Sequence, residues 1–156
     1  MPRRSAGIVL YRVRDGAPEV LLVHPGGPFW SRRDAGAWSF PKGEYEAGDD
    51  PREAARREFE EETGSALPPG ELIDLGSVRQ KGGKVVSAWA VEGDLDPDGV
   101  RSNTFRMQWP PRSGRWATFP EIDRAGWFGA DVAREKLVSA QAEFVDRLLG
   151  RLGHGD

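Results

Sequence analysis

The sequence predicts an α/β fold in which a mixed β-sheet is flanked by helices. Strand-like runs precede and surround two helical segments, without the regular strand–helix–strand alternation that builds a parallel sheet. The 156 residues suffice for a buried core, because domains cluster near about 100–150 residues. We therefore expect a single domain over residues 1–156, with its core in about residues 5–150.

Hydrophobic runs bounded by turn residues locate the strands. Four of them pair as two hairpins across turns that contain Gly: residues 7–13 with 19–24, and 72–79 with 84–91. Shorter strands are predicted at 37–40, which ends at Pro41, and at 125–128. Residues 93–120 are rich in Pro, Gly, Arg and Trp, so we expect a loop there.

Two helices are predicted. The first has clear boundary signals: Asp50 as N-cap, Pro51 at the first helical position, Glu53 to complete a capping box and Gly64 as the terminating residue. The second covers 132–149, where apolar residues recur at helical spacing.

Composition excludes several classes of protein and of site. The absence of Cys rules out disulfides, zinc–thiolate sites, iron–sulfur clusters and cysteine nucleophiles, and His24 and His154 are too few for a multi-histidine zinc centre. No apolar run is long enough to span a membrane, and the N-terminal residues lack the apolar core of a signal peptide. We expect a soluble, cytoplasmic protein.

The negative charge is concentrated in one segment. Residues 43–64 hold nine acids and three bases, whereas the rest of the chain holds 16 acids and 19 bases. Strong local acidity in a mildly basic frame suits a site that holds a hard cation next to a phosphate ester. The alternative is a solvent-exposed helix with an uneven charge pattern.

Three carboxylates in this segment share one face of the predicted helix. Glu58 is three residues from Glu61 and four from Glu62, so the three side chains converge. Oxygen donors without nitrogen or sulfur suit Mg²⁺ or Mn²⁺. In the alternative interpretation these glutamates pair with Arg56, Arg57 or solvent on an ordinary surface helix.

The segment resembles the motif of the Nudix hydrolase family: Gly, five residues, Glu, seven residues, then Arg-Glu-apolar-x-Glu-Glu-x-Gly-apolar. Here Gly43 opens the motif and residues 57–64, Arg-Glu-Phe-Glu-Glu-Glu-Thr-Gly, close it with matching spacing. Two positions depart from the pattern, Asp49 in place of Glu and Ser65 in place of an apolar residue. The resemblance covers roughly residues 5–150.

This resemblance implies an α/β/α sandwich with a mixed sheet, and hydrolysis of a nucleoside diphosphate linked to another group. Glu58 and Glu62 would be the principal metal ligands. Glu61 would be a further ligand, directly or through water, and the carbonyl oxygen of Gly43 would be another. The implied cofactor is Mg²⁺ or Mn²⁺.

The resemblance also implies catalytic roles. Arg57 would orient the glutamates by pairing with one of them. The base that accepts a proton from water differs between members: some use a helix glutamate, here Glu61, and others a glutamate on a late loop. The late residue here is Glu121, with Asp123 as a weaker substitute.

Substrate contacts are less defined by the sequence. Lys42 lies next to the motif glycine and is placed for a phosphate. Trp38 could stack on a base, and so could three aromatic residues of the 93–120 segment: Phe105, Trp109 and Trp116. Each of these tryptophans could equally be a packing anchor. Nearby arginines (Arg106, Arg112 and Arg115) are compatible with a nucleotide or polyphosphate pocket.

We expect a small nucleotide or polyphosphate as substrate. The run at 38–44, Trp-Ser-Phe-Pro-Lys-Gly-Glu, is similar to members that act on dinucleoside polyphosphates or oxidised nucleoside triphosphates. The alternatives are a non-catalytic nucleotide sensor, ADP-ribose hydrolysis and RNA-cap hydrolysis. The bases outside the motif are scattered along the chain, so no extended nucleic-acid footprint is predicted. No membrane partner is expected, and the oligomeric state stays open.

Overall fold

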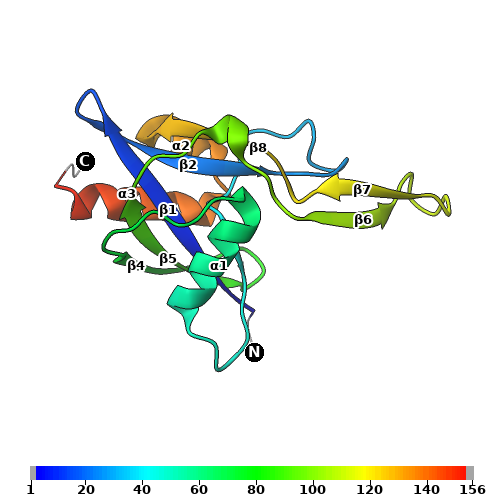
Figure 1. The fold of residues 1–156 in the computed structure, drawn as a ribbon, viewed down its shortest axis with the longest axis horizontal. Helices are drawn as coiled ribbons and strands as arrows, with labels where there is room; N and C mark the ends of the chain where they lie inside the picture. Colours follow the sequence, from blue (N-terminus) through cyan, green and yellow to red (C-terminus); the bar gives the residue numbers. More distant parts are fainter. Residues whose placement is uncertain (1–2, 154–156) are drawn as a thin grey trace.

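A computed structural model describes residues 3–153, and Figure 1 shows their arrangement. The strands are β1 (Arg4–Arg14), β2 (Ala17–Pro25), β3 (Lys42–Glu44), β4 (Ile73–Arg79), β5 (Val85–Glu92), β6 (Thr104–Gln108), β7 (Trp116–Pro120) and β8 (Ile122–Gly129). The helices are α1 (Pro51–Thr63), α2 (Ala130–Lys136) and α3 (Ala142–Arg151), with short 3₁₀ turns at Pro97–Gly99 and Ser139–Gln141. His154, considered above as a possible ligand, lies outside the described residues.

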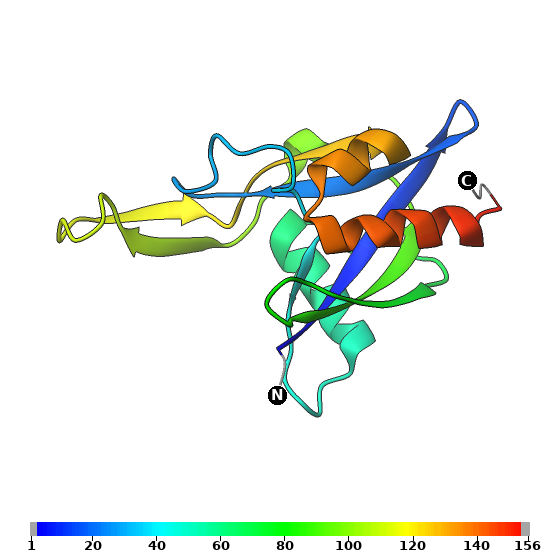
Figure 2. The ribbon, with the colours of Figure 1, turned by 180° about the vertical axis from the view of Figure 1, so that it is seen from behind.

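The main sheet has the order β4-β5-β1-β2-β8, with β3 paired to β1. Strands β1 and β5 run parallel and the other neighbours run antiparallel, so the sheet is mixed as predicted. Helix α1 covers one face, while α2 and α3 cover the other (Figures 1 and 2). The α/β/α sandwich is confirmed, and so are both predicted hairpins.

Each face of the sheet has its own core, because alternate residues of β1 point to opposite faces. Ile8 and Leu10 pack with Ala55 and Phe59 of α1. Val9 and Tyr11 belong to the second core, under α2 and α3, which includes Phe144, Val145 and Leu148 of α3. The helix that carries the glutamates is thus held by its apolar stripe against the centre of the sheet.

The predicted boundaries of α1 are confirmed. The Asp50 side chain accepts a hydrogen bond from the Arg52 N–H at 3.0 Å, and Gly64 ends the helix with a φ of 74°. The capping box is wrong, because the Glu53 carboxylate binds the Arg56 guanidinium instead of turning back to the N-cap. Glu53 forms the ion pair with Arg56, one helical turn away on the exposed surface, in place of a hydrogen bond to the N-cap backbone.

The strand predicted at 37–40 is wrong in position. Residues 38 and 39 form only isolated bridges, and the strand proper is β3, which follows Pro41. β1 pairs with β3 over residues 5–7 and with β2 over residues 11–14, so the chain at 38–44 enters the gap between β1 and β2. This insertion brings Lys42 and Gly43 onto the sheet beside α1.

The helix predicted over 132–149 is broken in two. Leu137 is extended, with φ −71° and ψ 148°, and it bridges to Trp38. The buried Gln141 side chain explains the break, because its Oε1 accepts a hydrogen bond from the Phe40 N–H at 3.0 Å and its amide nitrogen donates to Gln80. A continuous helix would lack the 3₁₀ turn at Ser139–Gln141, which places the Gln141 side chain beside Phe40.

Residues 93–120 are not a loop throughout. β6 and β7 form a separate two-stranded sheet that projects from the body of the molecule (Figures 1 and 2). Alternating residues in 104–108 carry the strand signal, which the surrounding Pro and Arg residues obscure. The strand predicted at 125–128 is longer than expected and begins at Ile122, directly after this hairpin. Among residues 3–153, no helix has the length and apolar character to cross a membrane.

Candidate active site

Two glutamates of α1 lie against the chain at β3. A Cβ atom placed on Gly43 would be 1.9 Å from Oε1 of Glu58, so only glycine leaves space for this carboxylate. The backbone N–H of Lys42 donates to Oε1 of Glu62 at 3.2 Å. Glu58 and Glu62 therefore lie against the backbone of residues 42–43.

Glu121 joins them from a distant part of the sequence. Its backbone is fixed on both sides: its N–H donates to the Asn103 carbonyl at 2.9 Å, and its carbonyl accepts from the Gly26 N–H at 2.8 Å. Lys42, Glu62 and Glu121 line one cavity of about 170 Å³. The remaining lining residues are Val23, Pro25, Ala37, Ser39 and Ile122.

The carboxylates raise one another's proton affinity. Burial raises the pKa of Glu62 to about 8, the charges of Glu58 and Glu121 add to the rise, and the Lys42 backbone hydrogen bond and charge oppose it. Burial, the charge of Glu61 and a hydrogen bond to Glu61 raise the pKa of Glu58 to about 7. A bound cation would relieve this repulsion.

The Lys42 ammonium shares this environment. Burial lowers its pKa, and the charge of Lys84 lowers it further. The charges of Glu62, Glu44 and Glu58 act in the opposite direction. A cationic side chain thus lies among the carboxylates at the cavity, where a phosphate would bring additional negative charge.

Arg57 and Glu61 are at the exposed edge of the site. The predicted pairing of Arg57 with a glutamate is not formed: within residues 3–153 its guanidinium is in no ion pair. Its charge does lower the pKa of Glu58, against the larger effect of burial. Glu61 is brought next to Glu58, as the helical spacing predicts.

Trp38 does not lie at the site as an open platform. Its side chain is only 4% exposed, and its indole nitrogen donates to Asp34 at 2.7 Å. Its ring packs edge to face with His24 and with Phe128. The prediction that Trp38 stacks on a substrate base conflicts with this burial. Trp38 instead packs inside the protein, as in the alternative in which it anchors the chain by packing.

The sequence does not predict a buried contact of His24 that the structure contains. His24 has no exposed surface; its Nδ1 lies 2.8 Å from Oδ1 of Asp123 and its Nε2 lies 2.6 Å from the Arg33 carbonyl oxygen. Asp123 is therefore engaged and less suited than Glu121 to act as a base. Nothing local in the sequence indicates this contact, since its members come from three separate segments.

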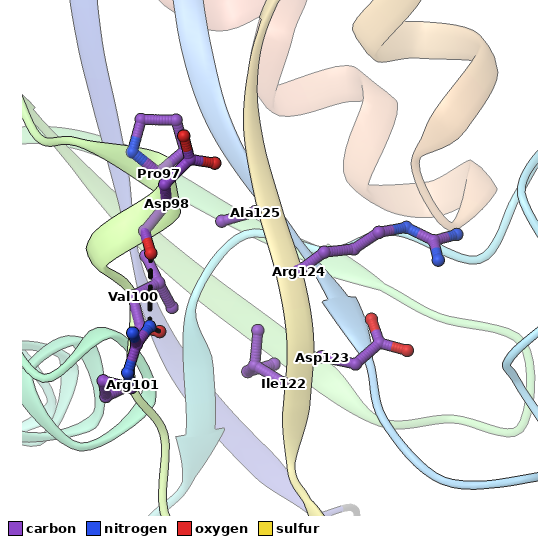
Figure 3. A pocket seen from close by; sticks show the side chains of 8 residues that line it. All are labelled: Pro97, Asp98, Val100, Arg101, Ile122, Asp123, Arg124 and Ala125. Atoms are coloured by element: carbon purple, nitrogen blue, oxygen red, sulfur yellow. Dashed lines mark hydrogen bonds between the residues drawn. The ribbon is translucent and has the colours of Figure 1, made fainter.

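A second pocket of about 180 Å³ lies beside the start of β8 (Figure 3). The side chains of Asp123 and Arg124 are directed away from Arg101 on the other side of the strand, and the Arg101 guanidinium donates to the backbone carbonyl of Asp98 at 3.2 Å. No carboxylate pair faces a common centre here. This pocket therefore differs from the surroundings of Gly43, where Glu58 and Glu62 of α1 lie close to the backbone.

The donor atoms beside Gly43 are of the chemical type that a hard divalent cation prefers. They are oxygen atoms, they include two carboxylates with raised pKa values on one helix face, and a backbone strand lies against them. Across residues 3–153, no three Asp, Glu or His side chains are close enough together to form a complete metal site by themselves. Backbone and substrate oxygens would have to complete the coordination.

Asp49, which replaces the first motif glutamate, makes a different contact. Its carboxylate accepts a hydrogen bond from the Glu46 N–H at 3.0 Å, and its own N–H donates to the Glu46 carbonyl. The shorter side chain thus closes the turn before α1. It stabilises the approach to the helix without reaching the other glutamates.

Comparisons with known proteins show which family the chain resembles. The NUDIX domain model matches residues 1–148. An octanoyltransferase from Myxococcus xanthus is 33% identical over 142 residues, which are 87% of this chain and 33% of that protein. An RNA pyrophosphohydrolase from Alkalilimnicola ehrlichii is 40% identical over 62 residues, 38% of this chain and 33% of that protein. The chain spans about a third of the length of these curated relatives.

Solved structures share the fold. A Caenorhabditis elegans Ap4A hydrolase binary complex has a TM-score of 0.68 at 21% identity, covering 96% of this chain and 98% of that one. The Nudix domain of Shewanella oneidensis NrtR, solved with ADP-ribose, has a TM-score of 0.63 at 17% identity, with coverages of 97% and 89%. The motif geometry and the match over residues 1–148 together establish that the chain belongs to the Nudix family.

Proposed function

We propose that this chain is a pyrophosphohydrolase that uses Mg²⁺ or Mn²⁺ to cleave a diphosphate linkage in a nucleotide derivative. Dinucleoside polyphosphates and nucleoside triphosphates, including oxidised ones, are the favoured substrates. The observation that carries the proposal is the convergence of Glu121 with Glu62 and Lys42 on one cavity, beside Glu58. The proposed unit is a single domain over residues 1–156.

Glu58, Glu62 and the Gly43 carbonyl would hold the cation, and Glu61 would contribute directly or through water. When bound, a divalent cation neutralises charge on diphosphate oxygens and positions water for in-line attack. The raised pKa values of Glu58 and Glu62 support this assignment, because a buried acidic cluster binds a cation in place of protons.

The chain's own groups would manage the proton and the phosphate charge. Glu121 accepts a proton from the attacking water as the new phosphorus–oxygen bond forms and the bridging oxygen leaves with the second phosphate. Lys42 offsets the charge of the phosphate oxygens at the cavity. Arg57, at the exposed edge, acts on Glu58 through its charge.

The test is hydrolysis of a substrate panel with Mg²⁺ and with EDTA. The panel contains diadenosine polyphosphates, ADP-ribose, 8-oxo-dGTP, ordinary triphosphates and capped RNA, with phosphate and nucleotide products quantified. We expect metal-dependent turnover of one class well above the rest. Tight metal-dependent nucleotide binding without any turnover would replace the proposal with the sensor interpretation.

A further inference from the structure

The β6–β7 hairpin and the loop beside it form one projecting unit, which we call the aromatic arm: residues 104–120 together with residues 26–33. The loop lies against the base of the hairpin: the Gly26 N–H donates to the Glu121 carbonyl at 2.8 Å, and a Cβ on Gly26 would be 1.9 Å from the Pro120 carbonyl oxygen. Further out, the rings of Phe29 and Trp109 pack edge to face, 5.3 Å apart. Figures 1 and 2 show the arm extending from the end of the sheet.

Exposed aromatic rings gather on this unit. Among residues 3–153, three large aromatic side chains are exposed, and all three lie here: Phe29 (57%), Trp30 (40%) and Trp116 (57%). The hairpin uses its other face for internal packing, where Phe105 and Phe119 are paired across the strands. The strands are thus paired through a face that leaves the Trp116 ring exposed.

The charge of the arm is of a single sign. Residues 26–33 and 104–120 contain five arginines and no lysine or acid: Arg32, Arg33, Arg106, Arg112 and Arg115. Within the described part of the chain none of the five forms an ion pair. Two of them lie over exposed rings, Arg106 over Trp116 at 5.3 Å and Arg33 over Trp30 at 5.5 Å.

We propose that the aromatic arm binds single-stranded nucleic acid. Exposed aromatic rings stack on unpaired bases of any identity, and arginines beside them bind the phosphates that follow at each nucleotide. Strand β7 is about 17 Å long and separates Glu121 from the exposed ring of Trp116, and Arg112 and Arg115 lie farther out than β7. The positive charge therefore extends along the arm. A single strand, which carries one phosphate per nucleotide, is long enough to contact several of these groups.

Charge argues against a second copy of the chain as the occupant. A symmetric pair of arms would place two arginine-rich, acid-free surfaces together, and like charges across an interface repel. The sequence alone predicts no extended footprint because these arginines lie in two segments about 70 residues apart. Folding brings them onto one unit.

Binding is tested separately from hydrolysis, with metal-free protein in EDTA. The anisotropy of a fluorescein-labelled oligouridylate is measured against protein concentration at several salt concentrations. We expect binding that weakens with salt, and weaker binding of a duplex of equal length, whose stacked bases cannot reach the rings. Trp116→Ala should weaken binding about tenfold.

Arginine variants test the phosphate contacts. Arg112→Ala and Arg115→Ala should each lower the slope of log affinity against log salt by about 0.7 for one lost phosphate contact. Arg14→Ala and Val13→Ala are the matched controls, since both residues are exposed at the end of β1, away from the arm, and should change neither quantity. Melting temperatures establish that each variant is folded.

Three results would overturn the inference: no binding of the oligouridylate at low salt, equal loss of binding in the Arg14→Ala control, or a dimer by light scattering that Trp116→Ala dissociates. The last would identify the arm as a self-association surface. Because the assay contains no metal, a failure of the substrate panel with oligouridylate binding intact would overturn only the proposed hydrolysis.

Discussion

Glu62 combines three properties that seldom occur together in a surface helix. It is partly buried, it accepts a backbone hydrogen bond from Lys42, and its pKa is raised to about 8. A carboxylate kept in such a place without a full ionic partner costs stability, which indicates a functional role. Its neighbour Glu58 has the same character, with a pKa of about 7.

Replacing Glu62 with Gln should separate activity from folding. The amide keeps the shape and the contact to Lys42 but removes a ligand charge, so turnover should fall by at least about 100-fold while the melting temperature stays level or rises. Product release and thermal unfolding measure the two effects. Retained turnover would show that Glu62 is not a metal ligand.

Gly43→Ala should disturb the same site by steric overlap with the Glu58 side chain. The added methyl would overlap the Glu58 carboxylate, and this flexible side chain would move away before the backbone does. We expect a roughly tenfold or larger loss of turnover with a folded protein. Gly99→Ala is the matched control, because a Cβ there meets no atom within 4 Å and the site is elsewhere. Equal activity of the two variants would contradict this assignment.

At the scale of elements, the break between α2 and α3 holds the chain that leads to the motif. The Gln141 side chain accepts from the Phe40 N–H and from the Ser39 hydroxyl, and it donates to Gln80. One side chain thus joins the helical layer, the 38–44 segment and the β4–β5 turn. Its position fixes the segment from which Lys42 and Gly43 emerge.

Gln141→Ala should therefore destabilise the fold. It leaves the buried Phe40 N–H without an acceptor, at a cost of about 1–3 kcal/mol. Urea unfolding measures the loss. Gln80→Ala removes only the outer partner and should cost less, so an equal loss in both variants would argue that Phe40 finds another acceptor.

For the whole molecule, the acidic cluster links stability to pH. In the unfolded chain Glu58 and Glu62 lose their protons near pH 4.5, whereas in the folded chain they hold them to about pH 7 and about pH 8. Between these values the unfolded state binds fewer protons, so the free energy of unfolding falls as pH rises. The destabilisation is complete only above about pH 8.

Thermal unfolding in EDTA should show this fall between about pH 5 and pH 8. Glu62→Gln should flatten the upper part of the curve. Mg²⁺ should raise the melting temperature more at pH 8 than at pH 6, since it binds the deprotonated carboxylates of the folded state. A melting temperature in EDTA that rises across this range would refute the linkage.

The sequence by itself determined the features that depend on neighbours along the chain. The boundaries of α1 follow from Asp50, Pro51 and Gly64, and the shared face of Glu58 and Glu62 follows from helical spacing. The two hairpins follow from hydrophobic runs and Gly-containing turns. These signals are local, so reading them requires no knowledge of the packing.

Only the tertiary structure decided which distant residues meet. Glu121 reaches the cavity of Glu62 because β8 lies beside β2, and Trp38 is buried because the split between β1 and β2 admits residues 38–44. The helix predicted over 132–149 is interrupted where the Gln141 side chain accepts a hydrogen bond from the Phe40 N–H. Each outcome depends on contacts between side chains and backbone groups that are far apart in the sequence. A local sequence pattern contains no information about such contacts, so it could not predict them.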